Sequence, residues 1–197
     1  MALDAAAEPA APAVIGPNAV LQTEAALVEA GGRDLAEQVF AAAGLSHLLT
    51  NRPGAMIDEA LPKALFVALF ATRPREEALH IAHRAGELTG DYILKHRIPG
   101  PVRTLLRLLP PRLAAPLLLT AIHKHAWTFA GSGLCSVTPG RPSRIEILAN
   151  PLAMPECAWH VGVFEVLFAS LVSPAVRIGH DHGPKLAGAP CRFEIAF

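Results

Sequence analysis

The chain has 197 residues, of which 52% are hydrophobic and 17% are charged, and its 17 basic side chains are balanced by 17 acidic ones. This length suits one domain with one core. A formal net charge of zero argues against a nucleic-acid-binding protein, which needs cations to displace counterions from phosphates. The hydrophobic content argues against global disorder and predicts exposed apolar surface. Such surface is typical of a site that binds a partner protein, a membrane or an apolar ligand.

The N-terminal residues 1–13 are rich in Ala and Pro and predict a disordered tail, followed by a single domain over residues 14–197. The tail lacks the basic start and apolar core of a signal peptide, and three scattered cysteines do not make a disulfide scaffold. Arginines and prolines interrupt the longest apolar stretch, 102–122, which argues against a membrane-spanning helix. We expect a cytoplasmic protein, with peripheral contact to a membrane left open.

The first two thirds of the chain have helical character. Apolar spacing, prolines and glycines predict helices over residues 18–30, 34–43, 58–72, 74–96, 102–109 and 112–125. The run 64–71 is apolar all the way round, which predicts a buried core helix or a dimer interface, with the wall of a ligand pocket as the alternative.

The last third alternates like a sheet. Strands are predicted over 127–137, 143–148, 175–180 and 191–196, with one helix inserted over 158–171. Helices followed by strands predict an α+β fold, an antiparallel sheet with helices packed on one face.

The sequence contains no recognisable motif for binding a redox nucleotide. Gly131-Ser132-Gly133 lies inside a predicted strand, where glycines favour a bulge rather than a pyrophosphate loop. A phosphate-binding loop, a nucleophile elbow and a zinc-protease helix are also missing from the sequence. We therefore do not expect a self-sufficient oxidoreductase.

Thiols and imidazoles gather near the C-terminus. Cys157, His180, His182 and Cys191 are the ligand types that zinc prefers, and four such groups close a structural site. Alternation along a strand points His180 and His182 the same way. The alternative is two buried thiols and a solvated His-rich turn.

A second cluster lies at the end of the helix predicted over 112–125. His123, His125 and Trp127 could bind a flat ligand by stacking and ligate a metal at its centre; the alternative is a cation favourable to the helix dipole beside a core Trp. His80, His83 and Glu87 share a helical face that suits either a metal or, more simply, a solvated polar stripe.

Basic side chains flank the apolar 98–118 segment. These are Arg97, Arg103, Arg107 and Arg112. They either snorkel from an apolar surface, clamp propionate or ester groups, or dock on an anionic membrane.

Several stretches resemble one known family. Residues 15–18, 91–99, 125–133 (HAWTFAGSG) and 191–195 (CRFEI) are similar to the bacteriochlorophyll 4-vinyl reductase family, and the similarity runs from about residue 14 to the end. The resemblance implies an α+β, commonly dimeric vinyl-4-reductase domain, related in fold to TRAPP transport subunits and to sensor domains of phenol-responsive regulators. It also implies a Mg-tetrapyrrole ligand, such as divinyl protochlorophyllide or a Mg-porphyrin.

Those sensor domains often hold zinc on a Cys, a Glu-x-x-Cys and a last Cys that follows after seven intervening residues. Here Cys157 and Cys191 match the outer thiols, His180 stands at the Glu, and Gly183 stands at the middle Cys. The departure puts zinc in doubt, although His180 and His182 could replace the two missing ligands.

Three functions follow from the resemblance. The first is a homodimeric carrier that binds Mg-tetrapyrroles and passes them to bacteriochlorophyll biosynthetic enzymes. Its pocket would form between helices and sheet, with Phe66, Trp127 and Phe129 as apolar surface, Arg97 as a clamp, and His123 or His125 as axial ligand. The second is an 8-vinyl (old 4-vinyl) reductase, and the third is a scaffold without pigment affinity.

Overall fold

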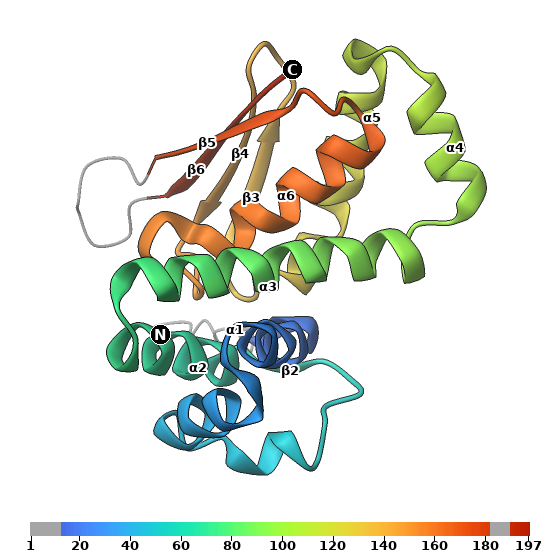
Figure 1. The fold of residues 1–197 in the computed structure, drawn as a ribbon. Helices are drawn as coiled ribbons and strands as arrows, with labels where there is room; N and C mark the ends of the chain where they lie inside the picture. Colours follow the sequence, from blue (N-terminus) through green and yellow to red (C-terminus); the bar gives the residue numbers. More distant parts are fainter. Residues whose placement is uncertain (1–12, 182–189) are drawn as a thin grey trace, which may run out of the picture.

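The computed structural model describes residues 13–181 and 190–197. Residues 1–12 of the tail predicted over 1–13 lie outside the described residues. The predicted metal ligand His182 lies outside them as well. The described residues form an α+β fold in which a four-stranded antiparallel sheet packs against helices, as predicted (Figure 1).

The helical part begins with two short strands, β1 (Val14–Ile15) and β2 (Ile57–Asp58), which pair antiparallel although α1 separates them in the chain. The helices that follow are α1 (Asn18–Ala42), the 3-10 turn η1 (Ser46–Leu49), α2 (Ala60–Thr72), α3 (Arg75–His96), α4 (Gly100–Leu108) and α5 (Pro111–Lys124). Gly31 and Gly32 leave helical geometry inside α1, so the two helices predicted on either side of them meet there in a kink.

The sheet has the strand order β3-β4-β6-β5. Its elements are β3 (Leu134–Thr138), β4 (Ser143–Leu148), β5 (Arg177–Asp181) and β6 (Cys191–Ala196), and α6 (Ala158–Leu171) follows the 3-10 turn η3 (Pro155–Cys157) between β4 and β5. Alternate residues of β4 and β6 are buried, including Ile145, Ile147 and Phe193. The opposite face carries cross-strand ion pairs, such as Arg192 Nε to Glu146 Oε1 at 2.9 Å, so one face meets helices and the other meets water.

Helix α3 crosses α6 with their backbones in direct contact. A side chain added at Gly86 would meet the Trp159 carbonyl oxygen, and one added at Gly162 would meet the His83 carbonyl oxygen. This close approach makes α3 the seam between two halves: α1 and α2 lie on one side of it, and α6 and the sheet lie on the other (Figure 1).

Two sequence predictions are wrong in detail. The strand predicted over 127–137 starts only at Leu134, because Ala126–Thr128 form a 3-10 turn, η2, and Gly131 takes a left-handed conformation (φ 56°) that a strand does not allow. Helix α2 is not buried on all sides within one chain, since Val67 is 57% exposed, and the dimer interface expected as the other reading stays a prediction. Its apolar face packs on α1, and the other face is open to solvent.

Within the described ranges, no helix has both the length and the apolar character needed to cross a bilayer.

Candidate metal site and the hollow beside it

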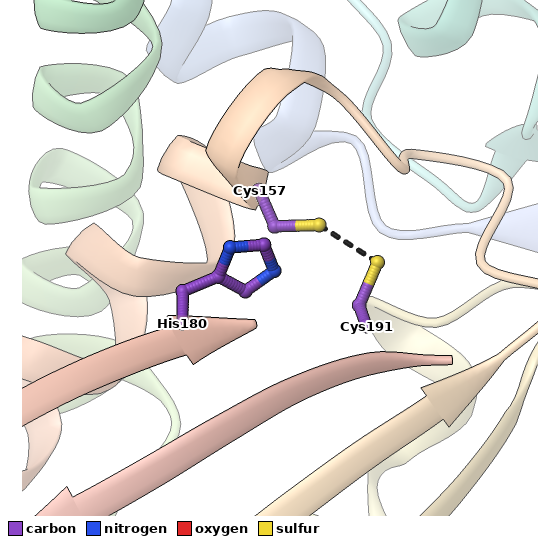
Figure 2. Close-up of side chains that lie close together, drawn as sticks. All are labelled: Cys157, His180 and Cys191. Atoms are coloured by element: carbon purple, nitrogen blue, oxygen red, sulfur yellow. Dashed lines mark hydrogen bonds between the residues drawn. The ribbon is translucent and has the colours of Figure 1, made fainter. Parts of the chain in front are cut away.

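Three side chains from separate segments converge at one end of the sheet. Cys157 lies just before α6, His180 lies on β5, and Cys191 begins β6 (Figure 2). Their ligand atoms all lie within 4.8 Å of one another, and both sulfurs are buried. The two Sγ atoms are 2.8 Å apart, well beyond the roughly 2.05 Å of a disulfide. Both cysteines are therefore free thiols in this structure.

The register of the sheet places two of the three ligands. His180 on β5 pairs with Phe193 on β6, so Cys191, two residues away on β6, is the diagonal neighbour of His180 on the same face. The period-two alternation of β6 buries Cys191 together with Phe193 and Ile195. Pairing with the next strand therefore brings the imidazole to the thiol.

A strained turn delivers the third ligand. Glu156 (φ 59°) and Cys157 (φ 41°) both lie in the left-handed region, and so does Ala149 (φ 51°) at the end of β4. Residues with a Cβ avoid this region, and each such residue costs of order 1 kcal/mol or more. The described non-glycine residues with positive φ are thus all within a few residues of this cluster, which is where a structure typically keeps strain for function.

Asn150 is a neighbour of the two sulfurs that the sequence reasoning missed. Its Nδ2 lies 3.4 Å from the Cys191 sulfur and 3.9 Å from the Cys157 sulfur, and its Oδ1 accepts a hydrogen bond of 3.0 Å from the Leu152 amide. The only signal in the sequence was an Asn before Pro151, which indicates a turn. The amide fixes the loop and donates toward the sulfurs, as groups around metal ligands commonly do.

The electrostatics separate the two thiols. The hydrogen bond from Cys157, helped by those from the His180 ring and the Asn150 amide, lowers the pKa of Cys191 well below its usual value. The same bond to Cys191, with burial as the second cause, raises the pKa of Cys157. Cys191 is therefore the first of the pair to become a thiolate, which is the form that binds metals.

This donor set fits zinc. Two thiolates and an imidazole are zinc ligands, and tetrahedral sulfurs about 2.3 Å from the metal would be roughly 3.8 Å apart, so Cys157 and Cys191 would have to separate by about 1 Å from their present spacing. The structure brings together three of the four predicted ligands, Cys157, His180 and Cys191. The fourth, His182, is outside the described residues.

A shallow hollow lies beside the cluster, with His180 in its wall. It has a volume of about 540 Å³ and is lined from α3, the start of α6 and β5. Its walls are Leu79, His80, His83, Glu156, Ala158, Val161, Ile178 and His180. Half of these walls are aliphatic, and the other half are three imidazoles and the Glu156 carboxylate. The volume is within the usual range of a small-molecule site.

The histidines of α3 are not alike. His83 Nε2 lies 2.7 Å from Glu165 Oε2, and Glu87 is bound to Arg84 at 2.9 Å, so both belong to an ion-paired stripe rather than to a free ligand set. The exposed His80 ring has no hydrogen bond or ion pair with the residues described here. Of the three predicted on this face, His80 is the imidazole open to a ligand.

The other predicted ligand-binding residues have different settings. His123, His125, Trp127 and Arg97 are exposed, and the Arg97 guanidinium lies 5.9 Å from the centre of the Tyr92 ring. Phe66 and Phe129 are buried in the hydrophobic core. Whether any of them contacts a ligand stays a prediction.

Two polar atoms beside the cluster are buried without a hydrogen-bond partner among the described residues. They are Trp159 Nε1 and His160 Nδ1, on the first turn of α6. Burial lowers the pKa of His160 to about 4, so the ring is neutral at physiological pH.

The fold and the cluster define an α+β protein with a candidate metal centre at the end of its sheet. No protein-family model matches the chain. The chain is 44% identical over 191 residues to the bacteriochlorophyll synthase 23 kDa chain of Cereibacter sphaeroides, covering 92% of this chain and 89% of that protein. It is 40% identical over 186 residues to the protein of the same name from Rhodobacter capsulatus, covering 92% and 86%.

The chain therefore belongs to the family of these bacteriochlorophyll synthase 23 kDa chains. The predicted relation to proteins of bacteriochlorophyll synthesis is confirmed at this level. The narrower assignment to the 4-vinyl reductase family stays a prediction.

Proposed function

We propose that the protein binds a Mg-tetrapyrrole intermediate of bacteriochlorophyll synthesis in the hollow beside His180 and delivers it to a biosynthetic enzyme. Two observations support this. Its relatives carry the name of a bacteriochlorophyll synthase chain, and the hollow combines aliphatic walls with an available imidazole. The hollow is the observation that carries the proposal.

The chemistry of the hollow suits a metal-centred macrocycle. Leu79, Val161 and Ile178 offer aliphatic surface to a planar apolar ring. His80 offers a ring nitrogen for the axial position, a role that imidazole plays toward metals in macrocycles. Because the hollow is open to solvent along α3, one face of the pigment would stay accessible to a receiving enzyme.

Titration with Mg-protoporphyrin tests this directly. The wild-type protein should shift and sharpen the Soret band at micromolar pigment, and His80→Ala should weaken the affinity and change the band position. His47→Ala is the matched control, since His47 is an exposed imidazole on η1, away from the hollow. The variant His125→Ala locates the site: loss of the shift there, and not in His80→Ala, would move the pigment to the exposed His123–Trp127 surface.

An unchanged spectrum with all variants would contradict the carrier function. It would leave a scaffold that binds pathway enzymes without pigment, which a pull-down of those enzymes by pigment-free protein would detect. The resemblance to the 4-vinyl reductase family supports a second function, reduction of the 8-vinyl group. Conversion of divinyl to monovinyl pigment by the pure protein with NADPH, or with an external electron donor, would establish it.

The zinc site is the second part of the proposal. Cys157, Cys191 and His180 would hold one structural zinc ion, with the fourth position filled by His182 or a water molecule. Metal analysis of protein purified without chelators should find about one zinc per chain. Cys191→Ser should lose the metal, whereas Cys135→Ser should keep it, because Cys135 lies on β3 outside the cluster.

Thiol counting distinguishes zinc from oxidation of the same pair. A zinc-bound protein releases three thiols when it is denatured with a chelator, because the chain has three cysteines. A protein with Cys157 and Cys191 joined in a disulfide releases one, and this result would contradict the zinc site.

A further inference from the structure

The charges of the chain are unevenly distributed. Between Asp91 and Glu146 there is no acidic residue, and this interval holds eight of the 17 Lys and Arg, which leaves nine basic against 17 acidic residues elsewhere. The eight are Lys95, Arg97, Arg103, Arg107, Arg112, Lys124, Arg141 and Arg144. A protein that is neutral as a whole therefore has a strongly basic part.

The same interval carries most of the exposed large apolar side chains. They are Val102, Leu105, Leu108, Leu113, Leu117, Trp127 and Leu134, while only Val28, Val67 and Leu148 of the described residues lie elsewhere. Leu105 and Leu108 are three apart on α4, and Leu113 and Leu117 are four apart on α5, so each pair shares a helical face. Leu108, the last residue of α4, is 79% exposed.

The arginines beside these leucines have no acidic partners among the described residues. Arg97, Arg103, Arg107 and Arg112 make no ion pair with any residue that the structure describes. Arg107 donates from Nε to the Ser170 carbonyl oxygen at 3.0 Å, and Arg97 lies against Tyr92. Their positive charge is available to an outside anion.

We infer that the helical hairpin of α4 and α5 docks on the surface of an anionic lipid bilayer. Helices that expose leucines between arginines insert the apolar side chains at the level of the headgroups while the guanidinium groups snorkel to phosphates. Figure 1 shows α4 at the right-hand edge of the molecule, with α5 between it and the sheet. The charge of the hairpin complements acidic headgroups, and its leucines supply the insertion that a purely electrostatic partner would not need.

This inference is independent of the proposed pigment binding, and pigment-free protein tests it. Purified protein is sedimented with vesicles of phosphatidylcholine alone or of phosphatidylcholine with phosphatidylglycerol. Binding should require phosphatidylglycerol and weaken as added salt shortens the screening length. Arg112→Gln should reduce the partition constant about fivefold, the effect of one basic side chain near an anionic surface. Leu108→Ser should reduce it roughly tenfold through the lost apolar burial.

Matched variants on α2 keep the test specific. Lys63→Glu and Val67→Ser change an exposed cation and an exposed aliphatic side chain on the other half of the molecule, and both should bind vesicles like wild type. Equal binding to both vesicle types, or binding that Leu108→Ser leaves unchanged, would overturn the inference. So would a dimer in size-exclusion chromatography that Leu108→Ser dissociates, because a second copy would then cover this face.

Discussion

The two helical regions of the molecule differ in whether their arginines form ion pairs with carboxylates. In the region of α1, α2 and α3, each arginine of residues 13–91 has a carboxylate partner. Arg33 and Arg52 bind Glu24, Arg73 binds Glu77, Arg75 binds Glu156, and Arg84 binds Glu29 and Glu87. In α4, α5 and their flanks, the arginines of residues 92–142 have no such partner among the described residues.

The contrast shows what a net charge conceals. Composition alone gives zero charge and argues against a nucleic acid as a partner. The arrangement gives a helical layer with paired arginines in one region and, in the other, a basic hairpin whose arginines have no carboxylate partner within residues 13–181 and 190–197. Electrostatic attraction acts over about a screening length of 8 to 10 Å. An approaching bilayer would therefore be attracted by the local charge of the hairpin, whatever the net charge of the whole protein.

The largest expected effect comes from breaking the seam between α3 and α6, which joins the paired helical region to the rest of the molecule. In Gly162→Ala the new methyl group on α6 would meet the His83 carbonyl oxygen on α3, and backbone atoms cannot rotate away. We expect a loss of more than about 3 kcal/mol in the free energy of unfolding, at the upper end for overpacking. Urea unfolding measures it, and Gly54→Ala is the control, because nothing lies within 4 Å of its new methyl group. Normal stability of Gly162→Ala would show that the seam can open.

The next effect is a pH dependence centred on α6. Burial holds the folded pKa of His160 near 4 against 6.5 in the unfolded chain, so the unfolded state takes up a proton first as pH falls. The contribution of His160 to the free energy of unfolding is fully present above pH 6.5. It is lost as the pH falls toward 4, by roughly 3 kcal/mol over the whole interval. Urea unfolding from pH 7.5 to 4.5 measures it. In His160→Phe this part of the slope should vanish, whereas His47→Ala should keep it; equal slopes in all three would refute the assignment.

A smaller effect tests the paired region. Glu24 is buried, and its Oε2 accepts 2.6 Å and 3.1 Å hydrogen bonds from Arg52, while Arg33 lies 3.4 Å from Oε1. Glu24→Gln removes the charge and keeps the shape. Because both arginines are more than half exposed and regain water, we expect a loss of only about 1 kcal/mol. Thermal unfolding against the exposed Glu76→Gln control measures it; no difference between the two would show that the pairs add nothing.

The sequence allowed the fold class and most element positions to be predicted because apolar periodicity is local. The helix 74–96 and the strand 191–196 match α3 and β6 closely. The strand 127–137 was wrong because aromatic and β-branched residues favour strands, whereas Gly131 here adopts a left-handed turn that composition does not reveal.

The candidate site was only partly predictable. Ligand chemistry singled out Cys157, His180 and Cys191, since thiols and imidazoles are few in the chain. Asn150 was beyond reach as a site residue, because its role depends on a strained turn. His80 was named as a candidate ligand with His83 and Glu87, but its place beside His180 depends on how α3 lies against β5. Pairing of charges is likewise a tertiary property. The sequence shows which arginines flank the apolar segment, and only the fold shows that no described carboxylate reaches them.

The smallest expected effect distinguishes the two regions most directly. Replacing an arginine by glutamine should lower the free energy of unfolding in one region and raise it in the other. Arg73→Gln removes the pair with Glu77, which joins the link between α2 and α3 to the first turn of α3 at 2.8 Å, and should lower the free energy of unfolding by about 0.3 to 0.5 kcal/mol. Arg103→Gln removes an unpaired cation one turn before Arg107 on α4, where like charges repel, and should raise it by a few tenths of a kcal/mol. Urea unfolding at low salt measures both, and high salt should shrink both toward zero. If both variants lose stability, an acidic partner serves Arg103 in solution, and the contrast between the paired layer and the unpaired hairpin disappears.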